Sequence, residues 1–511
     1  MGKSVFRIYF LALVSGKFFA METIENFVAN TLNENIWKII PVFLLAAGAY
    51  FGIRTLVVQI RMVPDMFRSV KEPAVGKSGE NISAFQAFSI SAASRVGTGN
   101  VVGVAIAITL GGPGAVFWMW IVALVGGATA FVEATLAQLW KSRDKDGYVG
   151  GPAYYMTKGL GAKPLALIFG IAITITYGFV YNAVQTNSIA EAAGSSLHAF
   201  NSNIAPDAAW LKIATGLLVA ALTALVIFGG VKRIASATQV IVPLMASAYI
   251  LLGVFVLAIN IAEVPAMFGT IVEHALGIKE IAGATLGAAF MNGMRRGLFS
   301  NEAGQGSAPN AAATAAVSHP VKQGLVQTLG VYFDTLVVCT ITAFIILLSD
   351  PAYGEGVQTA NLTQSALSAQ VGEWGTHFIT IILFFLAFSS VLGNYYLAQA
   401  NVEFFTKSKT KLNIFRVLVV LCVFGGAIGT VPLVWSLADT FAATMVLINL
   451  CAIVPLGGVA IKLLRDFSKQ KAAGMDPIFH RDSLPELKNV ECWDGTDPEC
   501  QRRELHNGAT A

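Results

Sequence analysis

Residues 94–103 read SRVGTGNVVG and lie inside an apolar segment that runs from about residue 83 to residue 110. The segment is long enough to cross a bilayer, which takes about 20 residues in a helix. Its middle nevertheless carries an arginine, three glycines and an asparagine. Three interpretations are open: a nucleotide-binding glycine loop, a kink that only lets helices pack closely, or a helix that is unwound to hold a ligand.

The composition indicates a membrane protein. The chain has 511 residues, of which 55% are hydrophobic and 13% are charged, whereas soluble domains carry about 25% charged residues. A net charge of +4 is too small to argue for nucleic acid as a partner. The five cysteines show no metal-ligand spacing, so we expect buried or reduced thiols.

Eleven apolar segments are about as long as a bilayer requires. They alternate with polar loops, and after Leu464 the chain is polar to its end. We therefore expect an all-α polytopic membrane protein with about 11 transmembrane helices. The approximate segments are 37–60, 83–110, 114–140, 165–190, 211–229, 236–260, 281–317, 321–349, 375–402, 413–430 and 433–464.

The loop charges predict the orientation. Lysine and arginine gather in the loops that follow every second segment, starting with the first, and in the tail. Because positively charged loops stay in the cytoplasm, we expect residues 1–36 outside, a transmembrane domain over 37–464 and a cytoplasmic tail over 465–511. Residues 1–20 resemble a secretory signal; the alternative is that translation starts at Met21.

A second segment, 281–317, is also interrupted. Residues 293–310 read GMRRGLFSNEAGQGSAPN, with four glycines, a proline, two arginines and a glutamate. Irregular backbone survives at membrane depth only where it is buried in protein or lines a cavity. The two interrupted segments each open a run of five, over about 83–260 and 281–464, and enter from opposite sides. We therefore expect one N-terminal helix and a 5+5 inverted repeat with two discontinuous helices, whose breaks mark the binding site.

The first break has the chemistry of a ligand site. Unwinding around Gly97 and Gly99 frees carbonyls at the end of one half-helix and N–H groups at the start of the next. Carbonyls suit a small cation, and N–H groups suit a carboxylate. The nucleotide interpretation is rejected because Gly97-x-Gly99-x-x-x-Gly103 misses the G-x-G-x-x-G spacing and follows no predicted strand. The matching second break argues against a packing kink.

Several charged residues fall within or at the edge of membrane segments, where a charge at the helix centre costs about 2.5–3.5 kcal/mol. Our hypothesis is that Arg95 and Glu302 are buried supporting charges that brace the two breaks. They would pair with each other, with Glu133 or with an arginine of the second break. The alternative is that the charges only fix helix register. The full set is Arg95, Glu133, Arg295, Arg296, Glu302 and Asp334.

Three blocks resemble those of the sodium:alanine symporters, the alanine or glycine:cation symporter family. They are GGPGAVFWMWIVALVG at 111–126, SRVGTGNVVG at 94–103 and RRGLFSNEAGQGSAP at 295–309. The resemblance covers about 37–464 and implies a leucine-transporter-type fold in the bacterial inner membrane. It also implies uptake of alanine or glycine with sodium as the co-transported ion. No organic cofactor, nucleic acid or obligatory protein partner is implied.

The resemblance also implies a substrate site. The fold's first core helix has a glycine-x-glycine-asparagine element, which Gly97, Thr98, Gly99 and Asn100 match. The substrate carboxylate would meet N–H groups near Gly99 and Asn100. The second break is expected over about 299–306. The substrate-binding residues are then Thr98, Gly99, Asn100, Phe299, Ser300 and Asn301.

A sodium site is implied in the same way. It takes carbonyls of Ala93 and Val96, the carbonyl of Leu386, and the hydroxyls of Ser389 and Ser390. On sequence alone, intramembrane hydroxyls like those in FSSVLGN, 388–394, usually bond back to their own helix. Arg95 is a departure from the pattern of this fold, because the better-known amino-acid transporters that share the fold have a small residue at this position.

Other functions remain open as alternatives. A cation channel could use broken helices, although channels usually repeat one subunit around a pore. A proton could replace sodium as the coupling ion. A membrane enzyme would have only Glu302 with Ser300 or Ser307 as a weak catalytic pair, and no histidine lies well inside a core segment. We expect a sodium-coupled symporter of small neutral amino acids and not an enzyme.

Overall fold

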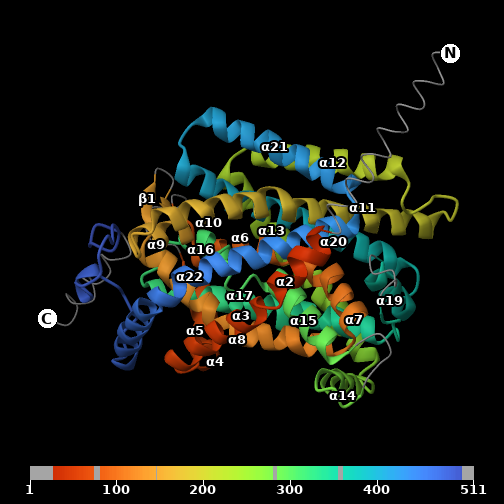
Figure 1. The fold of residues 1–511 in the computed structure, drawn as a ribbon, viewed down its shortest axis with the longest axis horizontal. Helices are drawn as coiled ribbons and strands as arrows, with labels where there is room; N and C mark the ends of the chain where they lie inside the picture. The colour runs from red at the N-terminus through yellow and green to blue at the C-terminus, as the bar shows by residue number, and fades with distance from the viewer. Residues whose placement is uncertain (1–26, 74–80, 145–146, 280–284, 355–360, 498–511) are drawn as a thin grey trace.

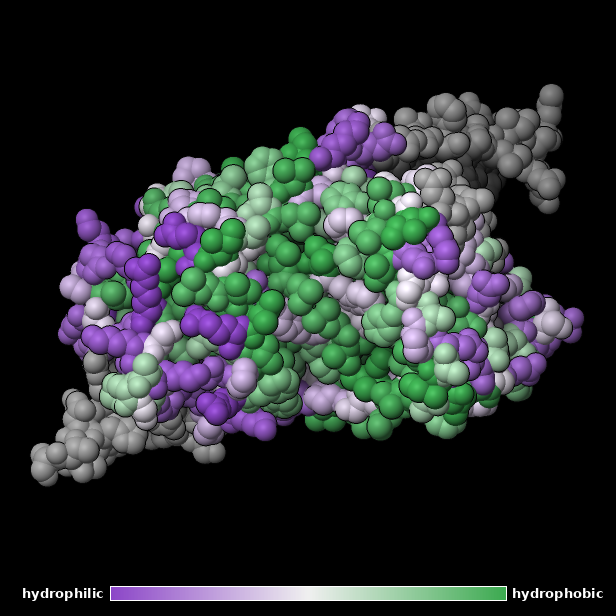
Figure 2. Space-filling view, turned by 90° about the horizontal axis from the view of Figure 1, so that it is seen from below, coloured by the Kyte–Doolittle hydropathy of each residue, from purple (hydrophilic) through white to green (hydrophobic). Residues whose placement is uncertain are grey.

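The computed structural model describes residues 27–73, 81–144, 147–279, 285–354 and 361–497. The signal-like stretch 1–20 and the alternative start at Met21 lie outside the described residues. The helices run mostly along the long axis of the molecule, with β1 and α9 at one end and α14 and α19 at the other (Figure 1). Figure 2 shows a broad apolar band between two ends where hydrophilic residues gather.

A short N-terminal group precedes the first break. Its main helix, α3, packs against α8 and α22 and corresponds to the predicted additional helix. The group comprises η1 (Phe27–Asn33), α2 (Glu34–Trp37), α3 (Ile40–Arg54), α4 (Val58–Arg61) and α5 (Val63–Val70).

The first run of five contains the first broken helix, three further helical spans and a bent one, α10–η3–α11. A β-hairpin, β1 with β2, pairs Arg143 opposite Tyr148 in antiparallel register. The elements are α6 (Ala84–Arg95), η2 (Gly99–Gly103), α7 (Val104–Gly111), α8 (Gly114–Leu139), β1 (Ser142–Asp144), β2 (Gly147–Val149), α9 (Pro152–Lys158), α10 (Lys163–Ile175), η3 (Thr176–Val180), α11 (Tyr181–Phe200), α12 (Ala209–Ile227) and α13 (Val231–Ile259).

The second run follows a connecting helix, α14 (Val264–Ala275). Its last helix, α22, continues past the predicted end of the membrane domain at residue 464. The elements are α15 (Leu286–Asn301), α16 (Ala308–Ala312), α17 (Pro320–Tyr332), η4 (Phe333–Cys339), α18 (Thr340–Leu347), α19 (Leu362–Val371), α20 (Trp374–Phe405), α21 (Lys409–Ile428), α22 (Val431–Ala472) and η5 (Arg481–Ser483).

The number of membrane spans differs from the prediction. In the described residues, nine helices are long and apolar enough to cross a membrane, or ten when Ala84–Arg95 and Gly99–Gly111, bent by 52°, count as one span. The predicted count of 11 is therefore not confirmed. The missing segment is 281–317, because its two helical pieces have 16 and 5 residues, each too short to cross alone.

The packing reflects two related halves. The second helix of the first run, α8, packs along its counterpart α17. The third members, α11 and α20, pack together, and so do the fourth members, α12 and α21. Equivalent helices pack against one another when two repeats are related by a two-fold axis. The expected 5+5 arrangement is therefore present.

The first halves of the two broken helices begin with equivalent caps. Ser83 Oγ accepts a hydrogen bond from the amide of Gln86 at 3.1 Å, and Gln86 Oε1 accepts from the amide of Ser83 at 2.9 Å. Thr285 Oγ1 accepts from the amide of Ala288 at 3.2 Å. Side-chain oxygens at these positions satisfy amides that have no partner within the helix. Each broken helix therefore has a locally determined start.

The two broken helices lie side by side and antiparallel. At one end, the amide of Ala316 donates to the carbonyl of Ile82 at 2.9 Å, which joins the end of the second segment to the start of the first. At the other end, a Cβ on Gly111 would lie 3.0 Å from the carbonyl oxygen of Ala288. The opposite directions predicted for the two segments are thus observed.

The second break lies slightly later than predicted. We expected it over 299–306, whereas α15 continues to Asn301 and the irregular backbone spans 302–307. Asn301 Oδ1 accepts the amide of Ala303 at 3.0 Å, and Glu302 takes a left-handed conformation with φ of 56°. The helix therefore ends at this turn, and the expected ligand residues of this segment lie on its last helical turn.

Candidate functional site

Side chains hold the first break open. Helix α6 ends at Arg95, and the amide of Gly97 donates to Oδ1 of Asn100 at 2.9 Å. The amide and the hydroxyl of Thr98 both donate to Oε1 of Gln185 on α11, at 3.1 and 2.7 Å. Backbone groups freed by the break thus find side-chain partners, which the bilayer core does not provide.

The glycines of the first break lie where other helices approach closely. A Cβ on Gly99 would lie 3.1 Å from Cδ1 of Phe299 and 3.2 Å from Cα of Ser300 on α15. A Cβ on Gly97 would overlap Oγ of Ser390 on α20. The absent side chains therefore let the break contact both the second broken helix and α20.

Oxygen atoms converge between the first break and α20. Ser389 Oγ donates to the carbonyl of Leu386 at 2.8 Å. Ser390 Oγ lies 3.0 Å from the same carbonyl and 3.4 Å from the carbonyl of Val96. Two carbonyls and two hydroxyls, all predicted as sodium ligands, thus form one hydrogen-bonded group. Oxygen donors of this kind are what hard cations prefer.

Ala93 lies next to this group. In a continued helix, the amide of Gly97 would donate to the Ala93 carbonyl, but here it donates to Asn100. A Cβ on Gly393 of α20 would lie 3.1 Å from Cβ of Ala93. The last turn of α6 therefore packs directly against α20, as the predicted site requires.

Asp334 joins the side chains of the two breaks. Asn100 Nδ2 donates to Oδ1 of Asp334 at 2.6 Å, and Ser300 Oγ donates to Oδ2 at 2.7 Å. Asp334 lies in η4, a π-helical stretch within the span of α17 and α18. Asn301 turns toward the same element, because its Nδ2 donates to Oγ1 of Thr335 at 3.3 Å. Asn100 and Ser300 thus bind the same carboxylate, and Asn301 binds the neighbouring residue, Thr335.

Aromatic rings lie beside Gly99 of the first break, which we call the glycine floor. The ring of Phe299, which lies next to Gly99, is 4.8 Å from the ring of Tyr181 and 4.9 Å from the ring of Trp435, between centroids. The three side chains come from α15, α11 and α22. They form an apolar wall beside the break.

A buried ion pair lies beyond this wall. Arg296 forms an ion pair with Asp439, and its guanidinium lies 4.8 Å from the ring centroid of Trp435. The two charged side chains are only 4% and 7% exposed. Arg296 precedes the second break by about one and a half turns, and Asp439 lies near the start of α22. The pair therefore lies toward the end at which α15 begins.

Glu133 of α8 holds the second break. Its carboxylate accepts the amides of Gly304 and Gly306 at 3.3 and 3.1 Å, and the amide side chain of Asn449 at 2.7 Å. Asn449 also donates to the carbonyl of Gly304 at 3.0 Å and accepts from the hydroxyl of Tyr155. Both glycines have positive φ, +83° and +77°, a conformation that favours glycine.

Arg95 and Glu302 do not pair with each other directly. Glu302 Oε2 accepts the hydroxyls of Ser94 at 3.1 Å and Ser307 at 2.7 Å. Arg95 Nη1 donates to the carbonyl of Gln327 on α17 at 3.3 Å, and its other two guanidinium nitrogens have no partner among the described residues. Glu302 thus links the two breaks through the neighbour of Arg95. Their role as supporting charges stays a prediction.

The whole site is closed to solvent in this conformation. Each predicted residue is buried, with an exposed fraction of 5% or less where one is given. The residues are Ala93, Arg95, Val96, Thr98, Gly99, Asn100, Phe299, Ser300, Asn301, Glu302, Leu386, Ser389 and Ser390.

Several residues in the site were not predicted to be part of it. Asp334 was noticed only as a costly membrane charge, and Glu133 as such a charge and a possible partner of Arg95 and Glu302, a signal that marks function without assigning a role at the second break. Gln185 and Asn449 are polar residues inside apolar segments, which is a weaker signal of the same kind. Tyr181 and Trp435 gave no signal, because an aromatic residue in an apolar helix most often packs in the core.

Comparison with known proteins identifies the family to which the sequence is similar. The profile described as the sodium:alanine symporter family matches residues 21–481. The amino-acid carrier protein AlsT of Bacillus subtilis is 50% identical over 475 residues, covering 93% of this chain and 99% of its own. The sodium/alanine symporter AgcS of Methanococcus maripaludis is 39% identical, over 86% of this chain and 97% of its own.

Two further comparisons broaden the picture. The probable sodium/glutamine symporter GlnT of Bacillus subtilis is 46% identical, over 95% of this chain and 99% of its own. The crystal structure of MhsT in complex with L-phenylalanine matches with a TM-score of 0.54 at 12% identity, covering 77% of this chain and 99% of that one. This likeness concerns the fold, and it confirms the expected leucine-transporter-type architecture.

The Glu133 carboxylate makes a stability prediction. In Glu133→Gln, the single carbonyl oxygen serves one glycine amide, and the new NH2 group faces the other. Leaving a buried donor unsatisfied costs about 1–3 kcal/mol, so we expect a lower unfolding temperature of the purified protein in a thermal scan. Glu263→Gln, the same change at an exposed position, is the control. An unfolding temperature equal to that of the unsubstituted protein would contradict the assigned contact.

Proposed function

The chain belongs to the sodium:alanine symporter family, and we propose that it carries small neutral amino acids such as alanine and glycine into the cell together with sodium. As a family member with many apolar helices, it is a multi-pass membrane transporter and not an enzyme. The proposal extends to the bacterial inner membrane as its location, with the N-terminus outside and the tail in the cytoplasm, on the basis of the loop charges.

One observation carries the proposal: the first break presents two kinds of ligand on its two sides. Toward α20 it offers the carbonyl of Val96 together with the oxygens of Leu386, Ser389 and Ser390. Toward α15 it offers the glycine floor at Gly99. A cation and an amino acid would thus bind to opposite sides of one unwound stretch, so the binding of each affects the backbone that holds the other.

The substrate is proposed to bind as a zwitterion. Its carboxylate would meet N–H groups near Gly99 and Asn100 at the start of the second half-helix. Its amino group would meet oxygen acceptors near Ser300 and Asp334. Its side chain would lie against Phe299. Because Gly99 lies directly against α15 in the closed conformation, the two breaks would have to separate slightly to admit even a small side chain.

Transport would follow from alternation between outward-open and inward-open states. The closed conformation described above has the Arg296–Asp439 pair and the Trp435 ring on one side of the floor. We propose that they form the outer barrier and separate when the outside opens. One sodium ion crossing 100 mV supplies about 2.3 kcal/mol, which is about fifty-fold accumulation of substrate. No covalent step is needed.

Uptake measurements test the function directly. We expect labelled alanine to accumulate in proteoliposomes when an inward sodium gradient is imposed, and not with a lithium or proton gradient. Accumulation driven by protons would favour the proton-coupled alternative, and passive cation flux without substrate would favour a channel. Sodium-independent flux, or no flux of any small neutral amino acid, would contradict the proposal.

The sodium ligands can be tested by removing hydroxyls. In Ser389→Ala and Ser390→Ala, we expect the sodium concentration for half-maximal uptake to rise about tenfold, equivalent to about 1.4 kcal/mol of lost binding. The apparent affinity for alanine at saturating sodium should change less. Ser89→Ala removes a buried hydroxyl that bonds to its own helix at 2.9 Å and serves as the control. Unchanged sodium activation would mean that the site lies elsewhere.

The glycine floor gives a matched pair of substitutions. In Gly99→Ala, the new methyl group would lie 3.1 Å from Phe299, and we expect the KM for alanine to rise at least about tenfold because the substrate space shrinks. Gly103→Ala is the control, since its Cβ would meet only ordinary contacts of 3.7 Å or more. The idea fails if both variants transport alanine with the same KM.

A further inference from the structure

The polar tail is docked on the molecule. After α22 ends at Ala472, the chain turns back along the end that holds β1 and α9 (Figure 1). Several tail residues are buried, among them Phe479 and Cys492 with no exposed surface and Trp493 with 1% exposed. We had expected a soluble tail from its polarity. Buried aromatic residues instead indicate a specific contact with the membrane domain.

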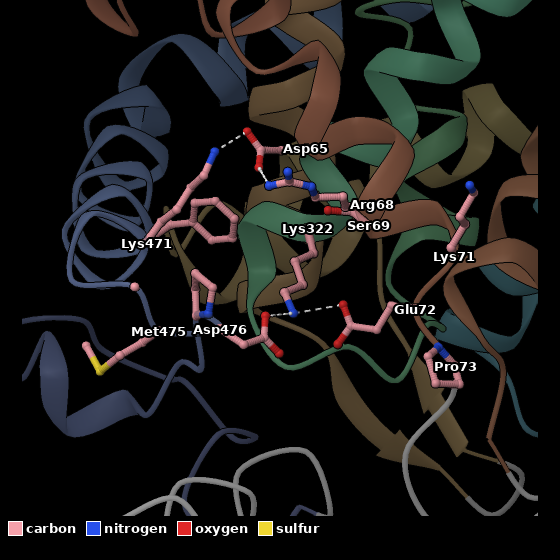
Figure 3. Close-up of a pocket in the computed structure, with 13 residues that line it drawn as sticks. Asp65, Arg68, Ser69, Lys71, Glu72, Pro73, Lys322, Lys471, Met475 and Asp476 are labelled. Atoms are coloured by element: carbon pink, nitrogen blue, oxygen red, sulfur yellow. Dashed lines mark hydrogen bonds and ion pairs between the residues drawn. The ribbon is translucent and has the colours of Figure 1, made fainter.

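One part of the tail binds the segment that follows the second break. The amide of Phe479 donates to the carbonyl of Ser318 at 2.8 Å, and Ser318 Oγ donates to the carbonyl of Pro477 at 2.9 Å. Lys322, at the start of α17, lies 2.8 Å from a carboxylate oxygen of Asp476 and 2.9 Å from one of Glu72. Figure 3 shows these ion pairs across a cavity of about 450 Å³ between α5 and the end of α22.

Another part of the tail binds the end of α8 and the hairpin. Trp493 Nε1 donates to the carbonyl of Gln138 at 3.2 Å. The ammonium of Lys141 lies 4.3 Å from the centroid of the Trp493 ring. Arg143 of β1 binds carboxylates of Asp494 at 2.8 Å and Asp497 at 2.9 Å. Cation–π and charge-assisted contacts of this kind strengthen when they are shielded from water.

The charges on the two surfaces are complementary. Among the described residues, five ion pairs hold residues 476–497 to the membrane domain. In each of them the domain contributes the basic side chain and the tail contributes the acidic one. The pairs are Lys322–Asp476, Lys158–Glu491, Lys462–Glu486, Arg143–Asp494 and Arg143–Asp497. The family profile ends at residue 481, so most of these acidic residues lie beyond the part of the chain that defines the family.

The docking surface includes the ends of both broken helices. Gln138, whose carbonyl binds Trp493, donates through Nε2 to the carbonyls of Ala312 and, at 2.9 Å, Ala315 at the end of the second segment. The next residue, Ala316, bonds to Ile82 at the start of the first. A tail bound here rests on the surface against which α6 closes.

We propose that residues 475–497 form a latch that holds this side of the transporter closed, and that the latch must loosen before the side opens. The latch fastens the end of the second broken segment, the end of α8 and the end of α22 to one another. Separation of α6 from this group then costs more while the tail is docked. The opening step rests on the proposed function, whereas the docking of the tail does not.

Cys492 reports on docking. It is a buried thiol beside the anchor Trp493, and burial raises its pKa to about 11, so it carries little thiolate for alkylation. We expect Trp493→Ala to raise the rate of Cys492 alkylation in the purified full chain at least about tenfold. Peptide-level mass spectrometry separates Cys492 from the other cysteines. Arg143→Ala, which removes contacts with Asp494, Asp497 and Thr496 at an exposed position, tests the same effect if the tryptophan variant folds poorly.

A second thiol reports on opening. Ala87→Cys places a cysteine on α6 at a position with no exposed surface, and we expect its alkylation to rise at least about threefold when Trp493→Ala or Arg143→Ala is added. Lys407→Ala removes a cation that binds the same hairpin through Asp144 at 3.5 Å and has no ion pair with residues 475–497; it should leave both rates unchanged.

The outcomes separate the two parts of the idea. Rapid alkylation of Cys492 in the unsubstituted protein would show that the tail is not docked and would overturn the latch. A faster reaction of Cys492 without any change at Ala87→Cys would show a docked tail that does not restrain opening, which also overturns it. Failure of alanine uptake with both alkylation effects intact would count against the proposed function and leave the latch standing.

Discussion

Backbone groups freed at the two helix breaks must find partners inside the protein, because the hydrocarbon core of a bilayer provides none. The polar side chains around the site meet this need. Gln185 and Asn100 accept amides of the first break, and Glu133 accepts two amides of the second. Gln185 comes from α11 and Glu133 from α8, so the breaks hold other helices at defined positions. The packing of the core around them follows from this requirement.

The same requirement connects the two breaks. Asn100 and Ser300 share the carboxylate of Asp334, and Ser94 donates to Glu302. A change in the backbone at one break therefore alters the partners available at the other. A network of this kind couples two binding sites when it has two discrete arrangements that each ligand favours differently.

Much of the architecture was predictable because it depends on local chemistry. Both breaks could be located within a few residues, because each combines several glycines with charged or polar residues, a composition that a lipid-facing helix does not tolerate. Loop charges and segment lengths gave the five-plus-five order. The exact end of α15 was not predictable, since it depends on Asn301 accepting the amide of Ala303. The docked tail was missed because its polarity resembles that of a solvated segment, while its partners on α17 and α8 lie 154 and 355 positions away.

Partner choice was the least predictable feature, and Arg95 illustrates why. We expected an arginine inside a membrane helix to pair with a nearby acid. Its guanidinium instead reaches α17, where it donates to the carbonyl of Gln327 and lies so close to Gly330 that a side chain there would overlap it. In the described residues, Arg95 thus forms no ion pair with Glu133, Glu302 or Asp334. Such an arrangement leaves each carboxylate free to accept the hydrogen bonds that hold the breaks, which a direct ion pair would have taken up.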